Sequence, residues 1–150
     1  MYNDSLKAQG VLQLTLIDEA GNVKSTDTHN LVVNTGLAYI ASRMRDTAQG
    51  VMTHMAVGSG TTAAAGADTA LGSQLARVTL DSTTIVTTTV AGDSVQYVAT
   101  FAAGTGTGAV TEAGLFNAST GGTMLCRTVF PVINKGELDT LVITWKVTVA

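Results

Sequence analysis

The stretch LVITWKVTV, residues 141–149, decides the fold class of this chain. Large apolar residues stand at every second position from Leu141 to Val149, and the positions between them hold Val142, Thr or Lys. Successive side chains of an extended strand point to opposite faces, so this spacing gathers the apolar groups on one face. The stretch therefore predicts a β-strand with one face in a core.

Segments of the same kind recur along the rest of the chain. They are rich in Val, Ile and Thr, which fit a pleated, half-buried surface, and glycine-containing turns separate them. The predicted strands cover residues 11–18, 23–33, 53–57, 77–90, 95–101, 110–117, 123–132 and 141–149, with a hairpin turn at 19–22. Short strands and turns at such spacing are typical of sandwiches and barrels. The sequence predicts a mainly β fold: an antiparallel β-sandwich or barrel-like domain with one or two short helices.

One segment has the periodicity of a helix instead. Its apolar residues at i, i+3, i+4 and i+7 are Leu37, Ile40, Ala41 and Met44. They predict a helix with Asn34 as its N-cap and with Arg43 and Arg45 in its last turn, where cations oppose the helix dipole. A second, shorter helical turn is expected over residues 69–76, although a glycine within it disfavours helix. Pro131 is expected to end a strand or to mark a bulge at a sheet edge.

Composition bounds the class of protein. The chain has 150 residues, of which 45% are hydrophobic and 13% charged, so we expect one folded domain spanning 1–150. The net charge of −3 gives no electrostatic reason to bind nucleic acid, and no apolar run approaches the ~20 residues of a membrane helix. Residues 1–10 lack the pattern of a secretory signal and are expected to form an extended arm. Cys126, the single cysteine, is expected to be a buried apolar residue in a protein folded in a reducing cytoplasm.

Groups suited to catalysis are sparse. The glycine-rich segments 58–60 and 104–108 lack the lysine of a phosphate-binding loop, so their glycines are expected to supply the positive φ of tight turns. Two histidines and one cysteine argue against a zinc site, and His54 is expected to be a hydrogen-bonded strand residue. Paired carboxylates for glycoside hydrolysis can come from any part of a fold and stay open. We expect no enzyme activity, no cofactor and no metal.

The segment TEAGLFN, residues 111–117, places one carboxylate in an otherwise apolar strand. Glu112 is expected to pair with Arg77 or Arg127 and so fix the strand order, or else to be solvated. Gly114 is expected to permit a bulge or the close packing of neighbouring strands. The segment is a structural signature and not a catalytic one.

Several of these segments together resemble a known family. The motifs are THMAVG at 53–58, TAL at 69–71 followed by an arginine, EAGLF at 112–116, NLVVNTGL at 30–37 and ITWKV at 143–147. In these motifs the chain is similar to the N-terminal attachment domain of tail-collar fibre proteins of tailed bacteriophages, and to short standalone phage structural proteins. The resemblance implies a non-enzymatic virion protein, assembled in the host cytoplasm, that binds copies of itself and a neighbouring virion protein.

Three functions follow as alternatives. Fibre proteins continue into a shaft and a receptor-binding tip, and this chain has neither, so we expect a tail, collar or baseplate module or adaptor. A capsid decoration protein that stabilises the head shell is the second alternative, and a carbohydrate-binding β-sandwich is the remote third. Binding a sugar calls for an exposed cluster of aromatic residues, and the aromatic residues of this chain are dispersed along the sequence. The expected contact surfaces are residues 1–10 and the loop 58–68, and the candidate contact or structural residues are Met1, Tyr2, His54, Gly58, Gly60, Asp68, Glu112, Gly114 and Phe116.

Overall fold

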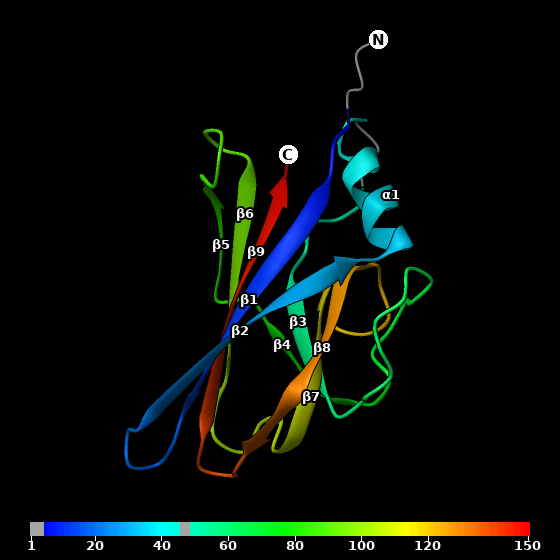
Figure 1. Cartoon of the computed structure of the whole chain (residues 1–150). Coiled ribbons are helices and arrows are strands. Elements are labelled where there is room, and N and C mark those ends of the chain that lie inside the picture. The colour runs from blue at the N-terminus through cyan, green and yellow to red at the C-terminus, as the bar shows by residue number, and fades with distance from the viewer. Residues whose placement is uncertain (1–4, 46–48) are drawn as a thin grey trace.

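Figure 1 shows the computed structural model of the chain, which describes residues 5–45 and 49–150. Within those residues it has nine strands and one helix. In chain order they are β1 (Ala8–Ile17), β2 (Val23–Val32), α1 (Asn34–Ser42), β3 (His54–Gly58), β4 (Gln74–Thr79), β5 (Ser82–Val86), β6 (Ser94–Phe101), β7 (Gly108–Phe116), β8 (Met124–Lys135) and β9 (Thr140–Val149). Strands hold 52% of the residues and the helix 6%, so the predicted mainly β class is confirmed.

The strands form a single antiparallel sheet that curls into a half-barrel. Its order is β4-β3-β7-β8-β2-β1-β9-β6-β5. The joint between β8 and β2 is short, because only Leu31 and Val32 of β2 pair with β8. This joint divides the sheet into two halves that lie opposite each other in Figure 1. The outermost strands β4 and β5 are consecutive in the chain, so Leu80 and Asp81 connect the halves on the other side. The predicted barrel-like domain is confirmed.

The core lies between the two halves of the sheet. Alternate residues of β1, β6 and β9 meet alternate residues of β3, β7 and β8, as the period-two pattern predicts. Trp145 is fully buried at the centre, and its indole Nε1 donates a hydrogen bond to Asn30 Oδ1 at 2.9 Å. Cys126 is a buried free thiol in this core, as predicted, and burial raises its pKa well above the ordinary value.

Helix α1 exists as predicted, but of its predicted apolar face only Ile40 packs against the core. Leu37 is 49% exposed and Met44 is 86% exposed, whereas Gly36 and Tyr39 are buried. The helix approaches β8 so closely that a Cβ at Gly36 would overlap the backbone carbonyl of Leu125. Gly36, Tyr39 and Ile40 therefore form the face that meets the sheet, with the closest approach at Gly36.

Both predicted ends of this helix also change. Val33 and not Asn34 is the N-cap residue, and its side chain makes no cap hydrogen bond. The helix ends at Ser42 with Arg43 as its C-cap, so its last turn holds no basic residue. Arg45 lies beyond the helix. The attachment to the sheet is polar at this point, since Thr35 Oγ1 donates to the carbonyl of Met124 at 2.8 Å.

Two other predicted elements differ in the structure. The helical turn expected over 69–76 is absent, because Gln74 already begins strand β4 and the preceding amides bind a side chain from β7. The strand expected over 77–90 is two strands, and after Val86 the chain turns around the Asp93 carboxylate. That carboxylate accepts hydrogen bonds from three backbone amides, which lower its pKa. In both cases the backbone amides bind a carboxylate, Glu112 or Asp93, and local sequence propensity does not reveal such a partner.

The expectation of an extended arm over residues 1–10 is wrong for Ala8–Gly10, which pair with β9 and belong to β1. Residues 1–4 of the expected arm lie outside the described residues. The expectation for Pro131 holds in part. Strand β8 continues past Pro131, which therefore does not end it. A bulge does occur there, since the β7 register moves from Val110 opposite Ile133 to Glu112 opposite Val129.

The contact between Gly36 and the Leu125 carbonyl gives a stability test. Replacing Gly36 with alanine is expected to displace α1 and to lower the free energy of unfolding by about 1–3 kcal/mol, as overpacking does. The matched control is Leu37→Ala on the exposed side of the same helix, expected to change it by less than about 0.5 kcal/mol. Urea denaturation measures both variants. Equal stability of the two variants would contradict the described packing of the helix.

Candidate functional site

The longest connection in the described part of the chain is the β3–β4 loop, residues 59–73, which contains neither helix nor strand. Structureless loops longer than about 12–15 residues are uncommon in compact domains and are usually functional or disordered. In Figure 1 this loop extends sideways from the β3 and β4 strands. It is tied to the sheet at several points, so it has a defined conformation.

The first tie is the carboxylate of Glu112, which projects from β7 beneath the loop. Glu112 is fully buried. Its Oε1 accepts hydrogen bonds from the amides of Gly60 at 2.9 Å and Ser73 at 2.7 Å, and its Oε2 accepts one from Gly72 at 2.9 Å. These amides stand at the two ends of the loop, so a single carboxylate closes it.

The second tie is the guanidinium of Arg127 on β8, which is 3% exposed. Its Nε and Nη2 donate to Glu112 Oε2 at 3.1 and 2.9 Å. On its other side Nη1 donates to Asp68 Oδ2 at 2.8 Å, and Nη2 donates to the carbonyl of Thr62 at 3.0 Å. Of the alternatives for Glu112, the structure selects pairing with Arg127, and Asp68 joins the same network.

Burial and hydrogen bonding act in opposite directions on Glu112. Burial raises its pKa, because removal from water disfavours the charged form. The amides of Ser73 and Gly72, the Arg127 side chain and the Gly60 amide lower it, and the pKa ends below its ordinary value. Glu112 is therefore an ionised carboxylate whose acceptor positions are occupied by the loop and by Arg127. Its role in this structure is to hold the loop.

Gly58 and Gly60 make space for the Glu112 carboxylate and do not supply the predicted positive φ. Neither has a positive φ, so the expectation of left-handed turn glycines is wrong for them. A Cβ at Gly60 would lie 2.5 Å from Glu112 Oε1, and a Cβ at Gly58 would lie at the same distance from that atom. These residues are glycines because the carboxylate occupies the space of a side chain. The expectation is confirmed for the other segment, 104–108, where all three glycines have positive φ.

The outer face of β7 carries a second small core beneath the loop. It consists of the buried residues Val33, Ala56, Phe116 and Met124, with Leu71 of the loop packed against them. Gly114 permits this close packing, because a Cβ there would lie 3.1 Å from the Leu71 side chain. Arg77 does not pair with Glu112. It stacks on the Phe116 ring, 3.7 Å from the ring centre.

The remaining candidate residues take no part in this network. His54 lies on β3, where its Nδ1 and Thr53 Oγ1 are 2.8 Å apart, so the predicted hydrogen-bonded strand histidine is confirmed. Met1 and Tyr2 lie outside the described residues. The site therefore brings together Gly58, Gly60, Asp68, Glu112, Gly114 and Phe116, which the sequence singled out, with Arg127.

The side chains on the solvent side of the loop are small and uncharged. Exposed residues between its two ties include Thr61, Ala63, Ala65 and Ala67. Between the loop and the splayed strands β2 and β8 lies a shallow hollow of about 360 Å³, lined by Ala63, Ala64, Leu31 and Val129 among others. The loop thus presents a fixed backbone with small neutral side chains to solvent.

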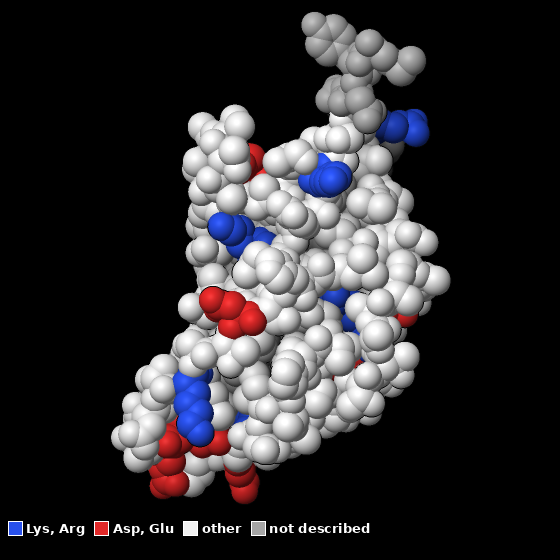
Figure 2. All heavy atoms as spheres, viewed as in Figure 1, with Lys and Arg blue, Asp and Glu red and all other residues white. Residues whose placement is uncertain are grey.

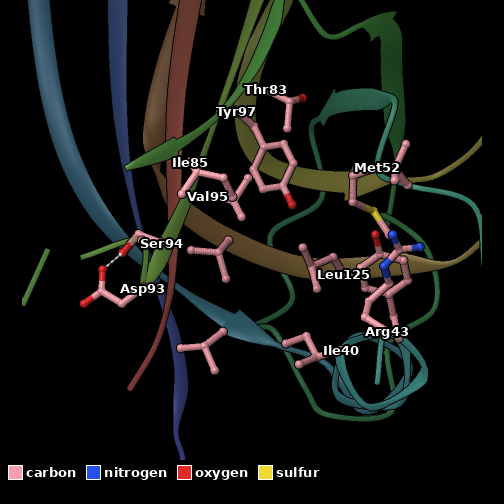
Figure 3. Close-up of a pocket in the computed structure, with 15 residues that line it drawn as sticks. Ile40, Arg43, Met52, Thr83, Ile85, Asp93, Ser94, Val95, Tyr97 and Leu125 are labelled. Atoms are coloured by element: carbon pink, nitrogen blue, oxygen red, sulfur yellow. Dashed lines mark hydrogen bonds between the residues drawn. The ribbon is translucent and has the colours of Figure 1, made fainter. Parts of the chain in front are cut away.

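A second hollow, which we call the α1 groove, has a volume of about 580 Å³. It lies between helix α1 and the ends of β5, β6 and β9, and Figure 3 shows its lining. Tyr39 and Tyr97 both belong to its wall, although the sequence suggested dispersed aromatic residues. Both are mostly buried, and burial raises the pKa of Tyr97 well above its ordinary value. No sequence signal marked this groove, because its walls come from elements far apart in the chain.

Within the described residues no group of three or more His, Cys, Asp or Glu side chains is placed to hold a metal ion. The described helix is too short to cross a membrane. Comparison of the chain with models of known protein families, with curated protein sequences and with solved structures gives no match.

The network predicts a large cost for removing the buried charge. Glu112→Gln leaves Arg127 buried with one charged partner fewer, and breaking such a pair typically costs about 3–5 kcal/mol. The matched control is Asp27→Asn on the exposed face of β2, expected to change stability by less than about 0.5 kcal/mol. Chemical denaturation at pH 7 gives both values. A Glu112→Gln protein as stable as the control would refute the anchoring role.

The lowered pKa of Glu112 also predicts a pH dependence. Because the folded-state pKa lies below the ordinary value of 4.5, the stabilisation is complete above that pH and is lost as the pH falls through the folded-state pKa. The difference in unfolding free energy between wild type and Glu112→Gln should therefore shrink between pH 7 and strongly acidic pH. Acidic residues outside this network titrate alike in both proteins and cancel in the difference. A difference that stays constant with pH would show that the charge of Glu112 is not involved.

Proposed function

We propose that this chain is a non-enzymatic structural protein of a tailed-phage virion, acting as a tail, collar or baseplate module or adaptor. It associates with copies of itself and docks on a neighbouring virion protein. The observation that carries the proposal is the β3–β4 loop, which is long, uncharged on its solvent side and fixed from below by Glu112 and Arg127. A surface that is already ordered loses little conformational entropy when it binds a partner.

The residues behind the phage resemblance support this reading. The motif EAGLF at 112–116 supplies the anchoring carboxylate, the close-packing glycine and the Phe116 ring under the loop. The motif at 53–58 ends at Gly58, against which the same carboxylate packs. Two of the motifs behind the resemblance thus coincide with the parts that build and hold the loop. A docking loop is a physical reason for such motifs to occur without catalytic residues.

The distribution of charge is consistent with assembly. Figure 2 shows few charged side chains on the face viewed, and several of them gather at the end that carries the β1–β2 turn. A surface with little charge repels other copies weakly, which favours repeated packing in a particle. This property suits both a tail module and a shell decoration, so copy number has to separate them.

Quantitative mass spectrometry of purified particles of the encoding phage tests the proposal. A tail, collar or baseplate module should be present in tens of copies per particle, counted against the major capsid protein. Hundreds of copies would instead identify a capsid decoration protein that stabilises the shell. Absence from purified particles would overturn the proposed function altogether.

A loop variant tests the surface itself. Ala63→Lys adds a long cation to the exposed side of the loop, and we expect at least tenfold less incorporation into particles with unchanged folding. Val132→Lys is the matched control, since Val132 is an exposed apolar residue of β8 outside the loop. Equal incorporation of the two variants would show that the loop is not the docking surface.

A further inference from the structure

The α1 groove combines features of a site for an extended chain. Its walls are mainly apolar, and Ile40, Met52, Val95 and Leu125 are among the residues labelled in Figure 3. At its rim the side chain of Ile85 is 69% exposed. Burying this apolar side chain against a partner would lower the free energy relative to leaving it in water. A groove of this size with apolar walls is large enough to receive several side chains.

Strand β5 forms one rim of the groove and has an open edge. Among the described strands it pairs with β6 alone, so its other side faces no strand. An edge strand presents a row of backbone donors and acceptors, and sheets usually protect such edges with charges or proline. The segment 82–86, STTIV, contains neither. Its edge is therefore suited to the addition of a further strand, with alternate side chains entering the groove.

The N-terminal segment leaves the fold at the same end of the barrel. Ala8 pairs with Val149, a residue that lines the groove, and Lys7 exchanges two backbone hydrogen bonds with Ala150 at 2.7 and 2.9 Å. Leu6, the next residue toward the N-terminus, is 73% exposed, and its side chain does not line the groove of its own copy. We therefore take a groove on another copy as its destination.

The segment and the groove are chemically complementary. Tyr2, Asp4 and Leu6 stand two residues apart, so an extended conformation places them on one side. Two of them are apolar, and the third carries a negative charge. The groove offers apolar walls and two charged groups, Arg43 and Asp93. The Asp93 carboxylate already accepts hydrogen bonds from three backbone amides of its own turn, so the Arg43 cation is the charge that faces an incoming acidic side chain. Six extended residues span about 20 Å, comparable with the five residues of β5 at about 17 Å.

We propose that residues 1–6 of a second copy add as a strand to the β5 edge, with Tyr2 and Leu6 in the α1 groove and Asp4 beside Arg43. The inference rests on the self-association in the proposed function and names the surfaces that carry it. The two surfaces differ, so the contact is heterologous. Such contacts close into rings or continue as chains.

Complementation between two variants of the full chain tests this arrangement. The arm variant carries Tyr2→Asp and Leu6→Asp, and the groove variant carries Ile85→Asp, at a position exposed enough to leave folding intact. Analytical ultracentrifugation should show wild type as an oligomer and each variant alone with at least tenfold weaker association. An equimolar mixture should form a 1:1 complex and grow no further, because it holds one intact arm and one intact groove. Val132→Asp is the control and should associate like wild type.

Each other outcome overturns the inference. If both variants associate like wild type, copies meet through a different surface and the proposed virion function stands. If wild type is monomeric at all concentrations, the arm does not join copies and self-association in solution fails as well. Circular dichroism then separates a folding defect from a binding defect, and the particle copy number tests the virion function independently.

Discussion

The ion pair between Glu112 and Arg127 is the interaction on which the outer layer of this protein depends. A buried ion pair is costly unless hydrogen bonds compensate for lost hydration, and here each charged group has such partners. The carboxylate binds amides from both ends of the β3–β4 loop, and the guanidinium reaches Asp68 within it. These bonds join residues up to 59 positions apart in the chain. A segment without secondary structure is thereby attached to the sheet at both of its ends and at Asp68.

Much of the fold could be predicted because the sheet leaves a strong local pattern. Alternation in segments such as 141–149 marks strands, since each has one face in the core. The partner of Glu112 could not be chosen between Arg77 and Arg127 from sequence. The choice depends on strand order, because both arginines stand level with Gly114, two residues from Glu112. Strand β8, which carries Arg127, is next to β7, whereas β4, which carries Arg77, is separated from β7 by β3. Strand order is a property of the assembled sheet.

The predictions that the structure contradicts share a physical cause: contacts with residues far away in the sequence outweigh local secondary-structure propensity. The helix turned its smallest residue, Gly36, toward the sheet because the approach to Leu125 leaves no space for a side chain. Residues 69–76 looked helical, yet the amides of Gly72 and Ser73 bind Glu112 instead of helix carbonyls. The α1 groove left no sequence signal, since four separate strands and a helix contribute to it.

The proposed docking surface requires that Glu112 fixes the conformation of the β3–β4 loop. Amide hydrogen exchange measured by NMR tests it most directly, at the amides of Gly60, Gly72 and Ser73. We expect these three loop amides to exchange as slowly as the amides of the neighbouring strand β7, since opening them requires breaking the buried pair. Exchange at the rate of an unstructured peptide, with β7 still protected, would contradict it.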